Sequence, residues 1–139
     1  MPVTLKKIKI NSKGDTDIID ITSMVINALS GVKINSGLVT VFVSGSTGGL
    51  TTVEYEPGLV QDLKNFFEVI APKSGRYEHN LRWHDGNGYA HVRASLLGPS
   101  ISIPFIKGHL ELGQWQQIIF IDFDNRPRSR DLIVQIIGE

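Results

Sequence analysis

Apolar and polar residues alternate in short runs near both ends of the chain, and this two-residue period is typical of β-strands. In residues 3–10 the alternation changes phase, which predicts a strand with a bulge or a twist. Further strands are expected at residues 16–21, 37–44, 50–54, 100–105, 107–111, 115–123 and 130–137. The last two are apolar on both faces, so we expect helices to cover one face and another sheet or subunit to cover the other. Trp115 opens the first of them and is expected to be buried with its indole N–H satisfied.

Helical spacing is clearest at residues 57–70, where apolar residues recur on one side after an initial proline. Shorter helices are expected at residues 22–31 and 89–98, each ended by a glycine. Residues 73–88 show no such period and are expected to form a loop. The pattern predicts one α+β domain spanning residues 1–139, with mixed or antiparallel β-sheets and two to three short helices.

The composition favours a compact, soluble protein. The chain has 139 residues, of which 41% are hydrophobic and 20% charged. The hydrophobic residues are numerous enough to form a core, and the low charged fraction argues against intrinsic disorder. Lys plus Arg equals Asp plus Glu at 14 each, so no overall field favours nucleic acid or an anionic membrane. Cysteine is absent, which excludes disulfides and thiolate chemistry. Without an apolar leader or a long apolar segment, we expect a cytoplasmic protein.

Ionisable side chains gather in residues 77–100, which contain three of the four histidines. These are His79, His84 and His91, and Asp85 lies among them. Imidazole is the side chain best suited to metal ligation or proton transfer near neutral pH. The spacings of five and seven residues do not match the helical pair of a zinc protease, but a loop can fold such groups onto one ion. The alternative is a set of surface or hydrogen-bonded histidines without a ligand.

Two carboxylates, Glu54 and Glu56, lie just before the helix predicted at 57–70. In a strand both would point to the same face, where the pair can bind a metal or act as a base. Carboxylates also stabilise helix N-termini through the macrodipole, and we prefer this interpretation for Glu56. Glu54 is the more open to a catalytic role.

Two further segments are candidates for holding an anion. Residues 44–49, Ser-Gly-Ser-Thr-Gly-Gly, can present backbone N–H groups to a phosphate, although the Gly-Lys-Ser/Thr ending of a Walker loop is absent. A plain turn or bulge explains the same residues. Arg126, Arg128 and Arg130 surround a proline, and a solvated hairpin turn accounts for them equally well.

Several separated motifs occur in a fixed order between Lys7 and Val134. They are Ser-Gly-Ser-Thr at 44–47, Thr-Thr-Val-Glu at 51–54, Tyr-Glu-His-Asn at 77–80, His-Asp-Gly-Asn-Gly at 84–88, Ala-His-Val-Arg-Ala-Ser-Leu-Leu-Gly-Pro-Ser at 90–100 and Leu-Gly-Gln-Trp-Gln at 112–116. Together they resemble the YjbQ family, small proteins labelled secondary thiamine-phosphate synthases. The resemblance implies a YjbQ-like α+β domain with a mixed sheet, assembled as a homotrimer around a polar pocket with a divalent metal, zinc or magnesium.

Carried over position by position, the resemblance places the family's Glu at Glu54 and its histidines at His79 and His91. Its acidic loop maps to Asp85 and Asn87, and its Gly-Trp-Gln element to residues 113–116. Many members have His-Thr-Ser-Ala after the third strand, where this chain has Ser-Gly-Ser-Thr. This chain therefore lacks the side chain that could coordinate a metal at the end of that strand, and His84 is a candidate to replace it.

We therefore expect a metal-assisted enzyme that acts on a phosphorylated small molecule. The expected metal ligands are His79, His91 and Asp85, with Glu54 as an alternative acid, and the expected catalytic residues are His84, His91 and Glu54. The expected substrate-binding residues are Ser46, Thr47, Asn87, Arg93, Trp115 and Gln116. The alternatives are a metal-dependent hydrolase of a phosphorylated or cyclic substrate and a non-enzymatic trimer that binds a metal or metabolite.

Overall fold

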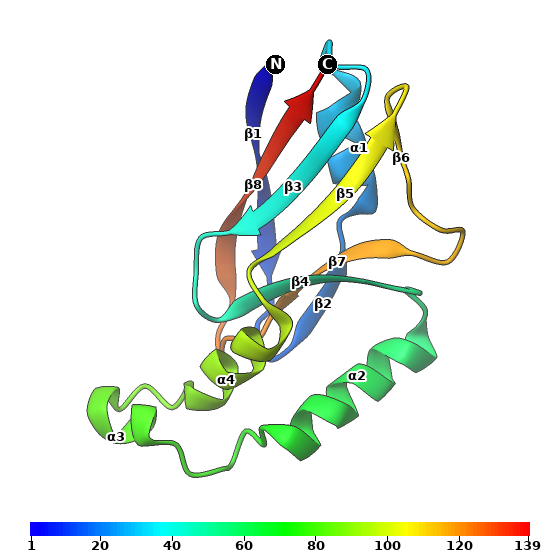
Figure 1. Cartoon of the computed structure of the whole chain (residues 1–139). Helices are drawn as coiled ribbons and strands as arrows, with labels where there is room; N and C mark the ends of the chain where they lie inside the picture. The colour runs from blue at the N-terminus through cyan, green and yellow to red at the C-terminus, as the bar shows by residue number, and fades with distance from the viewer.

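The computed structural model describes all 139 residues as one α+β domain. Its elements are β1 (Val3–Ser12), β2 (Asp17–Asp20), α1 (Thr22–Ser30), β3 (Gly37–Val43), β4 (Gly48–Val53), α2 (Pro57–Ile70), α3 (Glu78–Trp83), α4 (Gly88–Leu97), β5 (Ser100–Ile106), β6 (His109–Leu110), β7 (Gln117–Asp122) and β8 (Arg128–Gly138). The strands form a five-stranded sheet in the order β1-β8-β3-β5-β6 and a three-stranded sheet in the order β2-β7-β4. Every strand pair is antiparallel, as Figure 1 shows.

The three-stranded sheet lies between two hydrophobic cores. On β7, Ile118 and Phe120 point into the core that α1 shares with the five-stranded sheet. Ile119 and Ile121 point into the second core, which α2 and α4 complete below the sheet in Figure 1. The expectation that β7 is covered on both faces is therefore confirmed. Its central position explains why its sequence lacks the polar alternation of a one-sided strand.

Of the bulge or twist predicted for residues 3–10, the bulge is absent from β1. It pairs with β8 residue by residue, from Val3 opposite Ile137 to Ser12 opposite Arg128. The change of phase arises from a side chain, because Lys6 points inward and its Nζ donates to the carbonyl of Ala28 at 2.8 Å. A lysine stem can cover apolar surface while its ammonium reaches a carbonyl, so this inward position tolerates a charge.

The four helices exceed the two to three expected, because residues 78–83 form α3 in a segment predicted to be a loop. None of the α3 residues is buried, so no apolar stripe marks this helix in the sequence. The start of α2 agrees with the interpretation of Glu56, whose carboxylate accepts hydrogen bonds from the N–H groups of Gly58 and Leu59. None of the four helices combines the length and the apolar character needed to cross a bilayer.

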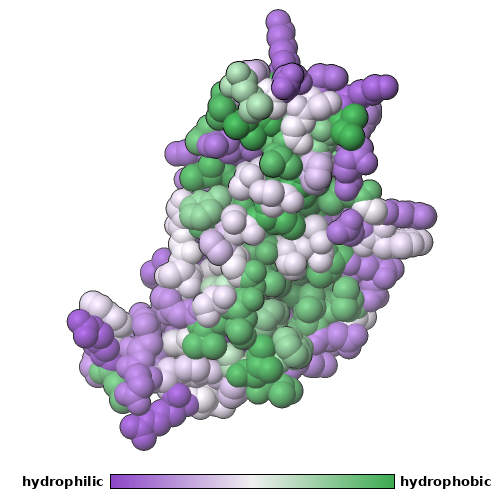
Figure 2. All heavy atoms as spheres, in the orientation of Figure 1, coloured by the Kyte–Doolittle hydropathy of each residue, from purple (hydrophilic) through white to green (hydrophobic).

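One face of the five-stranded sheet is open, and we call it the outer face. Its apolar side chains are Val3, Leu5, Leu38, Phe42, Ile106, Ile133 and Ile137. In Figure 1 this face is turned toward the viewer with no helix in front of it, and Figure 2 shows apolar atoms spread over it among neutral polar ones. Strand β8 is therefore covered on one side only within a single chain.

Candidate functional site

Three segments distant in sequence meet at one end of the two sheets. They are the loop between β3 and β4, the α3–α4 region, and the turn between β7 and β8. The loop contributes Ser46 and Thr47, the helices contribute His79 and His91, and the turn contributes Asp124. Most of the side chains singled out in the sequence lie here.

His79 and His91 stand side by side. Their ring centroids are 4.2 Å apart and the rings are tilted by 40°. His79 lies in the first turn of α3 and His91 in the first turn of α4, so the short connection between the helices brings the rings together. Asp85, on that connection, places its Oδ1 3.6 Å from Nδ1 of His79, beyond a normal hydrogen bond. Nδ1 of His79 is buried and has no hydrogen-bond partner.

The environment of His91 favours the neutral imidazole. Burial lowers its pKa below the ordinary value of 6.5, and the neighbouring His79 lowers it further. The carboxylates of Asp85 and Asp124 act in the opposite direction but do not reverse the shift. Near neutral pH His91 therefore offers a ring nitrogen with a free lone pair, as a general base requires.

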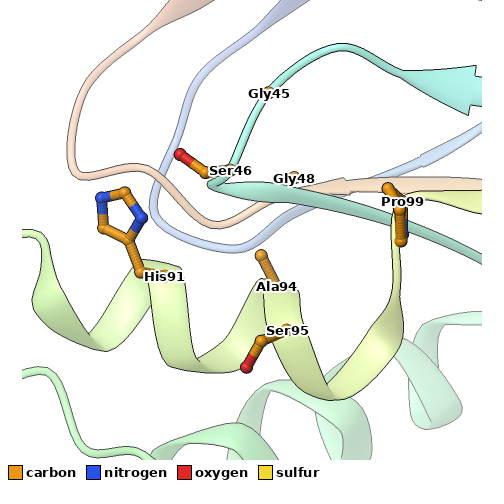
Figure 3. Close-up of a pocket in the computed structure, with 7 residues that line it drawn as sticks. All are labelled: Gly45, Ser46, Gly48, His91, Ala94, Ser95 and Pro99. Carbon is orange, nitrogen blue, oxygen red and sulfur yellow. The ribbon is translucent and has the colours of Figure 1, made fainter.

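His91 lines a pocket of about 280 Å³ between α4 and the β3–β4 loop. The pocket is lined by Gly45, Ser46, Gly48, His91, Ala94, Ser95 and Pro99. Figure 3 shows the Ser46 side chain and the His91 ring at the same end of it. The Ser95 hydroxyl donates to the carbonyl of Val92 at 2.7 Å, so Ser46 carries the free hydroxyl of the pocket. The volume is at the lower end for small-molecule sites.

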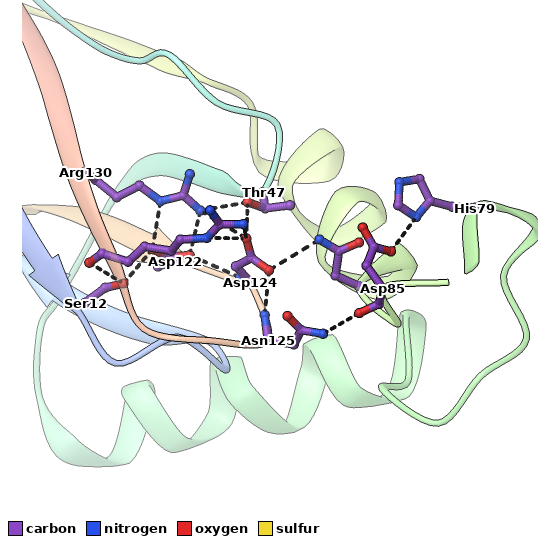
Figure 4. A network of polar contacts seen from close by, with 10 residues as sticks. Ser12, Thr47, His79, Asp85, Asp122, Asp124, Asn125 and Arg130 are labelled. Atoms are coloured by element: carbon purple, nitrogen blue, oxygen red, sulfur yellow. Dashed lines mark hydrogen bonds and ion pairs between the residues drawn. The ribbon is translucent and has the colours of Figure 1, made fainter. Parts of the chain in front are cut away.

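Behind the loop lie two buried ion pairs, drawn in Figure 4. Asp122, which is 0% exposed, accepts hydrogen bonds from Ser12 Oγ at 2.6 Å and from Nε and Nη2 of Arg130 at 2.9 and 3.0 Å. Asp124, which is 1% exposed, pairs with Nη2 of Arg128 at 2.6 Å. Buried charges are tolerated when they are paired and hydrogen-bonded in this way.

Asp124 stays ionised despite its burial. Burial alone would raise its pKa, but hydrogen bonds from the Asn125 N–H and from the guanidinium of Arg128 outweigh that effect and lower it. The result is a fixed negative charge directly behind the loop and close to the start of α4. It accepts a hydrogen bond from the Thr47 hydroxyl at 3.2 Å.

Asn87 lies between this buried group and Asp85 beside the histidine pair. One amide orientation lets Nδ2 donate to Asp124 Oδ1 at 3.3 Å, and the other lets it donate to Asp85 Oδ1 and Oδ2 at 2.9 and 3.1 Å. We favour the second, because it forms two shorter hydrogen bonds to Asp85 in exchange for the single longer one to Asp124. Asn125 also donates through Nδ2 to the carbonyl of Asp85 at 2.8 Å. The connection that carries Asp85 is thus fixed from two sides.

Six of the predicted site residues lie together at this end of the molecule, namely Ser46, Thr47, His79, Asp85, Asn87 and His91. Glu54 does not join them, because it follows the far end of β4 and is exposed. Six residues of strand span about 20 Å, so within one chain Glu54 cannot reach His91. Gln116 lies at that far end too, where its Nε2 donates to Thr52 Oγ1 at 3.2 Å.

The expectation that Trp115 is buried is wrong. The side chain is 64% exposed, because β7 begins only at Gln117 and the preceding residues form a loop. The apolar strand therefore starts after the tryptophan, which the pattern of residues 115–123 does not reveal. Trp115 and the histidine pair lie at opposite ends of β7.

Arg93 and His84 are also separated from the pocket. Arg93 follows His91 by two residues on α4, so its side chain leaves the opposite face of the helix. It is buried and donates to the carbonyl of Ala71, to Thr16 Oγ1 and to the carboxylate of Glu68, at 2.9, 2.8 and 2.7 Å. All three of its nitrogens are thereby occupied. His84 is exposed and ends α3 in the left-handed conformation, with φ of 57°.

The donor atoms at the histidine pair suit a metal in kind but not in arrangement. Two imidazoles and a carboxylate are ligands that zinc accepts, and the partnerless Nδ1 of His79 is an available donor. However, nowhere in the chain are three or more His, Asp or Glu side chains gathered so that they could share one ion. The residues present therefore fit a metal only incompletely, and none of them is assigned a metal-dependent step.

The buried acids at the end of β7 and their arginine partners were not predicted from the sequence. The available signal was the run Ile-Ile-Phe-Ile-Asp-Phe-Asp at 118–124, where Asp122 and Asp124 follow strongly apolar residues. Carboxylates in such a strand are rarely buried without a partner, and the alternating arginines at 128 and 130 were the available cations. The pairing itself requires the turn between β7 and β8 to fold back.

Comparison with known proteins places this architecture in a family. The family described as UPF0047 protein YjbQ-like matches residues 6–139. A UPF0047 protein of Archaeoglobus fulgidus is 39% identical over 137 residues, covering 99% of this chain and 100% of the relative. One from Methanothermobacter thermautotrophicus is 35% identical over 139 residues, covering 100% and 95%. The crystal structure of a YbjQ-like protein of unknown function from Sulfolobus solfataricus is similar, with a TM-score of 0.94, 30% identity and 99% of each chain covered.

Proposed function

The chain belongs to the UPF0047 YjbQ-like family, and we propose that it is an enzyme acting on a phosphorylated small molecule in the pocket beside His91. The observation that carries the proposal is the neutral His91 ring at the pocket wall, paired with a His79 whose Nδ1 is buried without a partner. A buried, partnerless polar atom costs free energy, and a bound ligand would remove that cost.

The proposed chemistry is proton transfer. His91 accepts the proton of the attacking nucleophile, either a water molecule or a substrate group, while Ser46 binds the substrate through its free hydroxyl. Burial and the neighbouring His79 keep the pKa of His91 low, and the Asp85 carboxylate beside His79 opposes that shift without reversing it. A well-placed base of this kind typically contributes a factor of about 10² to 10⁴ in rate. Glu54 and His84 have no step in this scheme, because neither meets the pocket within one chain.

Two reaction types fit these parts. Hydrolysis of a phosphorylated or cyclic substrate uses His91 directly, because the attacking water must lose a proton. Thiamine-phosphate synthesis, which the family resemblance implies, joins a pyrimidine carrying a pyrophosphate to a thiazole phosphate and needs donors for the leaving pyrophosphate. Both belong in the first panel of assays, and the predicted zinc or magnesium ion is checked by elemental analysis of the purified protein.

The decisive comparison uses two histidine variants. We expect His91→Gln to reduce turnover of the active substrate at least about 100-fold with an unchanged melting temperature. His109→Gln is the matched control, because His109 is exposed on β6 at the far end of the molecule. Equal turnover in both variants would refute the catalytic proposal. Ligand-dependent stabilisation without turnover of any substrate would favour the non-enzymatic alternative.

We also propose that three copies assemble through the outer face, in the cytoplasm. Support comes from its exposed apolar side chains, among them Leu5 at 53% and Phe42 at 39%. Covering such a face removes apolar surface from water. Phe42→Asp should shift the sedimentation velocity profile toward monomer, whereas Met24→Asp, on α1 and equally 39% exposed, should not. A monomeric wild-type protein at micromolar concentration would exclude the assembly.

A further inference from the structure

We propose that the β3–β4 loop is the phosphate-binding element of this pocket. In this arrangement the backbone N–H groups of Gly45 and Ser46, which line the pocket, bind one phosphate group of the ligand, and Nη1 of Arg130 reaches it beside Gly45. The inference rests on the proposed function, since it names the ligand chemistry of the same pocket. It assigns to Arg130 the role that the sequence suggested for Arg93.

The loop has three consecutive N–H groups without an acceptor. None of the amides of Gly45, Ser46 and Thr47 donates a hydrogen bond to any group of the chain. Gly45 and Ser46 line the pocket, so their N–H groups can meet a ligand there, whereas Thr47 is only 5% exposed and lies behind the lining. Buried backbone donors are nearly always paired, and a run of free ones in a turn is the arrangement that binds oxyanions.

The loop is fixed in place before any ligand arrives. The Thr47 hydroxyl accepts a hydrogen bond from Arg130 Nη2 at 2.7 Å and donates one to Asp124 at 3.2 Å. Its carbonyl accepts from the Phe123 N–H at 2.9 Å. The Thr47 side chain is therefore fully used as an anchor. This leaves the N–H groups and the Ser46 hydroxyl for the ligand, with little ordering of the loop needed on binding.

Arg130 lies against the loop, and one of its three side-chain nitrogens makes no hydrogen bond. Its Nε and Nη2 are bonded to Asp122 and Thr47, whereas Nη1 donates to no group of the chain. Nη1 would lie 3.0 Å from a Cβ placed on Gly45, so the absence of a side chain at Gly45 is what lets the guanidinium approach the loop. The side chain is 13% exposed and lines a neighbouring hollow that includes Ser44, so it can meet a ligand only at the edge of the loop.

The local charge balance sets the expected behaviour. Arg128 and Arg130 are matched by Asp122 and Asp124, so the buried group is neutral overall. Attraction for the anion then comes from directed N–H groups rather than from a net positive field. We therefore expect binding that favours phosphate and pyrophosphate, which take several donors at once, over acetate, and that depends only weakly on salt.

The test titrates inorganic phosphate, pyrophosphate and acetate onto the full-length, ¹⁵N-labelled protein. We expect phosphate and pyrophosphate to shift the amide resonances of Gly45 and Ser46, and acetate to leave them in place. Gly45→Ala crowds Nη1 of Arg130 and should weaken phosphate binding about 10-fold, as expected for loss of a charge-assisted hydrogen bond. Gly31→Ala is the matched control, because its added Cβ meets only the flexible ammonium of Lys6, at 2.9 Å.

Unshifted loop amides, or wild-type affinity in Gly45→Ala, would overturn the phosphate site. His91→Gln separates this inference from the proposed function, because it should abolish turnover but keep phosphate binding. Full turnover in His91→Gln with shifted loop amides would refute the catalytic role alone. Lost turnover in His91→Gln without any amide shift would refute the phosphate site alone.

Discussion

Removing the carboxylate of Asp122 should destabilise the fold strongly. Asp122 is completely buried and accepts hydrogen bonds from Ser12, from two nitrogens of Arg130 and from the N–H of Asp124 at 3.1 Å. Asp122→Ala leaves the buried Arg130 with only one longer ion pair, because Oδ2 of Asp124 lies 3.7 Å from Nη2. The Ser12 hydroxyl loses its acceptor in the same step.

The magnitude follows from the partners left behind. Breaking a buried ion pair by deleting one member costs about 3–5 kcal/mol. The separate hydrogen bonds do not add to this figure, because they belong to the same pair. With a urea m-value of about 2 kcal/mol/M, the unfolding midpoint should fall by roughly 2 M.

The assay is equilibrium unfolding in urea, followed by tryptophan fluorescence. Asp131→Ala is the control, since Asp131 is exposed on the same strand as Arg130 and should change stability by less than about 0.5 kcal/mol. A loss below about 1 kcal/mol for Asp122→Ala would show that Arg130 finds another partner or water, and the rigid support behind the β3–β4 loop would then be refuted.

Three further predictions concern single side chains. The pKa of His91 in the folded protein lies below its unfolded value of 6.5. The stability that neutral His91 contributes is therefore complete above pH 6.5 and is lost as the pH falls through the lowered pKa. Urea unfolding between pH 7.5 and 5 should show this loss in wild type and not in His91→Gln. Glu56→Ala should cost about 0.5–2 kcal/mol through the lost cap of α2, whereas Glu54→Ala should cost almost nothing by the same assay. Arg93→Met should lower the melting temperature but leave phosphate affinity unchanged in a calorimetric titration, and a selective loss of affinity would return Arg93 to the binding site.

Local periodicity predicted most of the elements of this fold. The alternation of residues 37–44 matches β3, and the apolar stripe of 57–70 matches α2 residue for residue. The same reasoning failed at α3, which buries no side chain, and at Trp115, where the apolar run begins just after the loop. Periodicity reports burial, so it does not detect a helix that lies on the surface.

Only part of the candidate site could be predicted from the sequence. The histidines were found because their residue type is chemically distinctive, and the structure brings His79 and His91 together. The support of the β3–β4 loop could not be found in the same way. Asp122 and Arg130 are eight residues apart, yet their pairing with Thr47 depends on how β4, β7 and β8 meet. Such contacts are set by the tertiary fold and leave no local pattern.

The proposed function requires His91 to be a neutral base that lies against His79 at the edge of the pocket. The most direct test is an NMR titration of the four histidine rings in wild type and in His79→Gln. We expect the His91 ring to titrate below 6.5 in wild type and its pKa to rise when His79 is replaced. A His91 ring that titrates at 6.5 or above, with no response to His79→Gln, would contradict the proposed function.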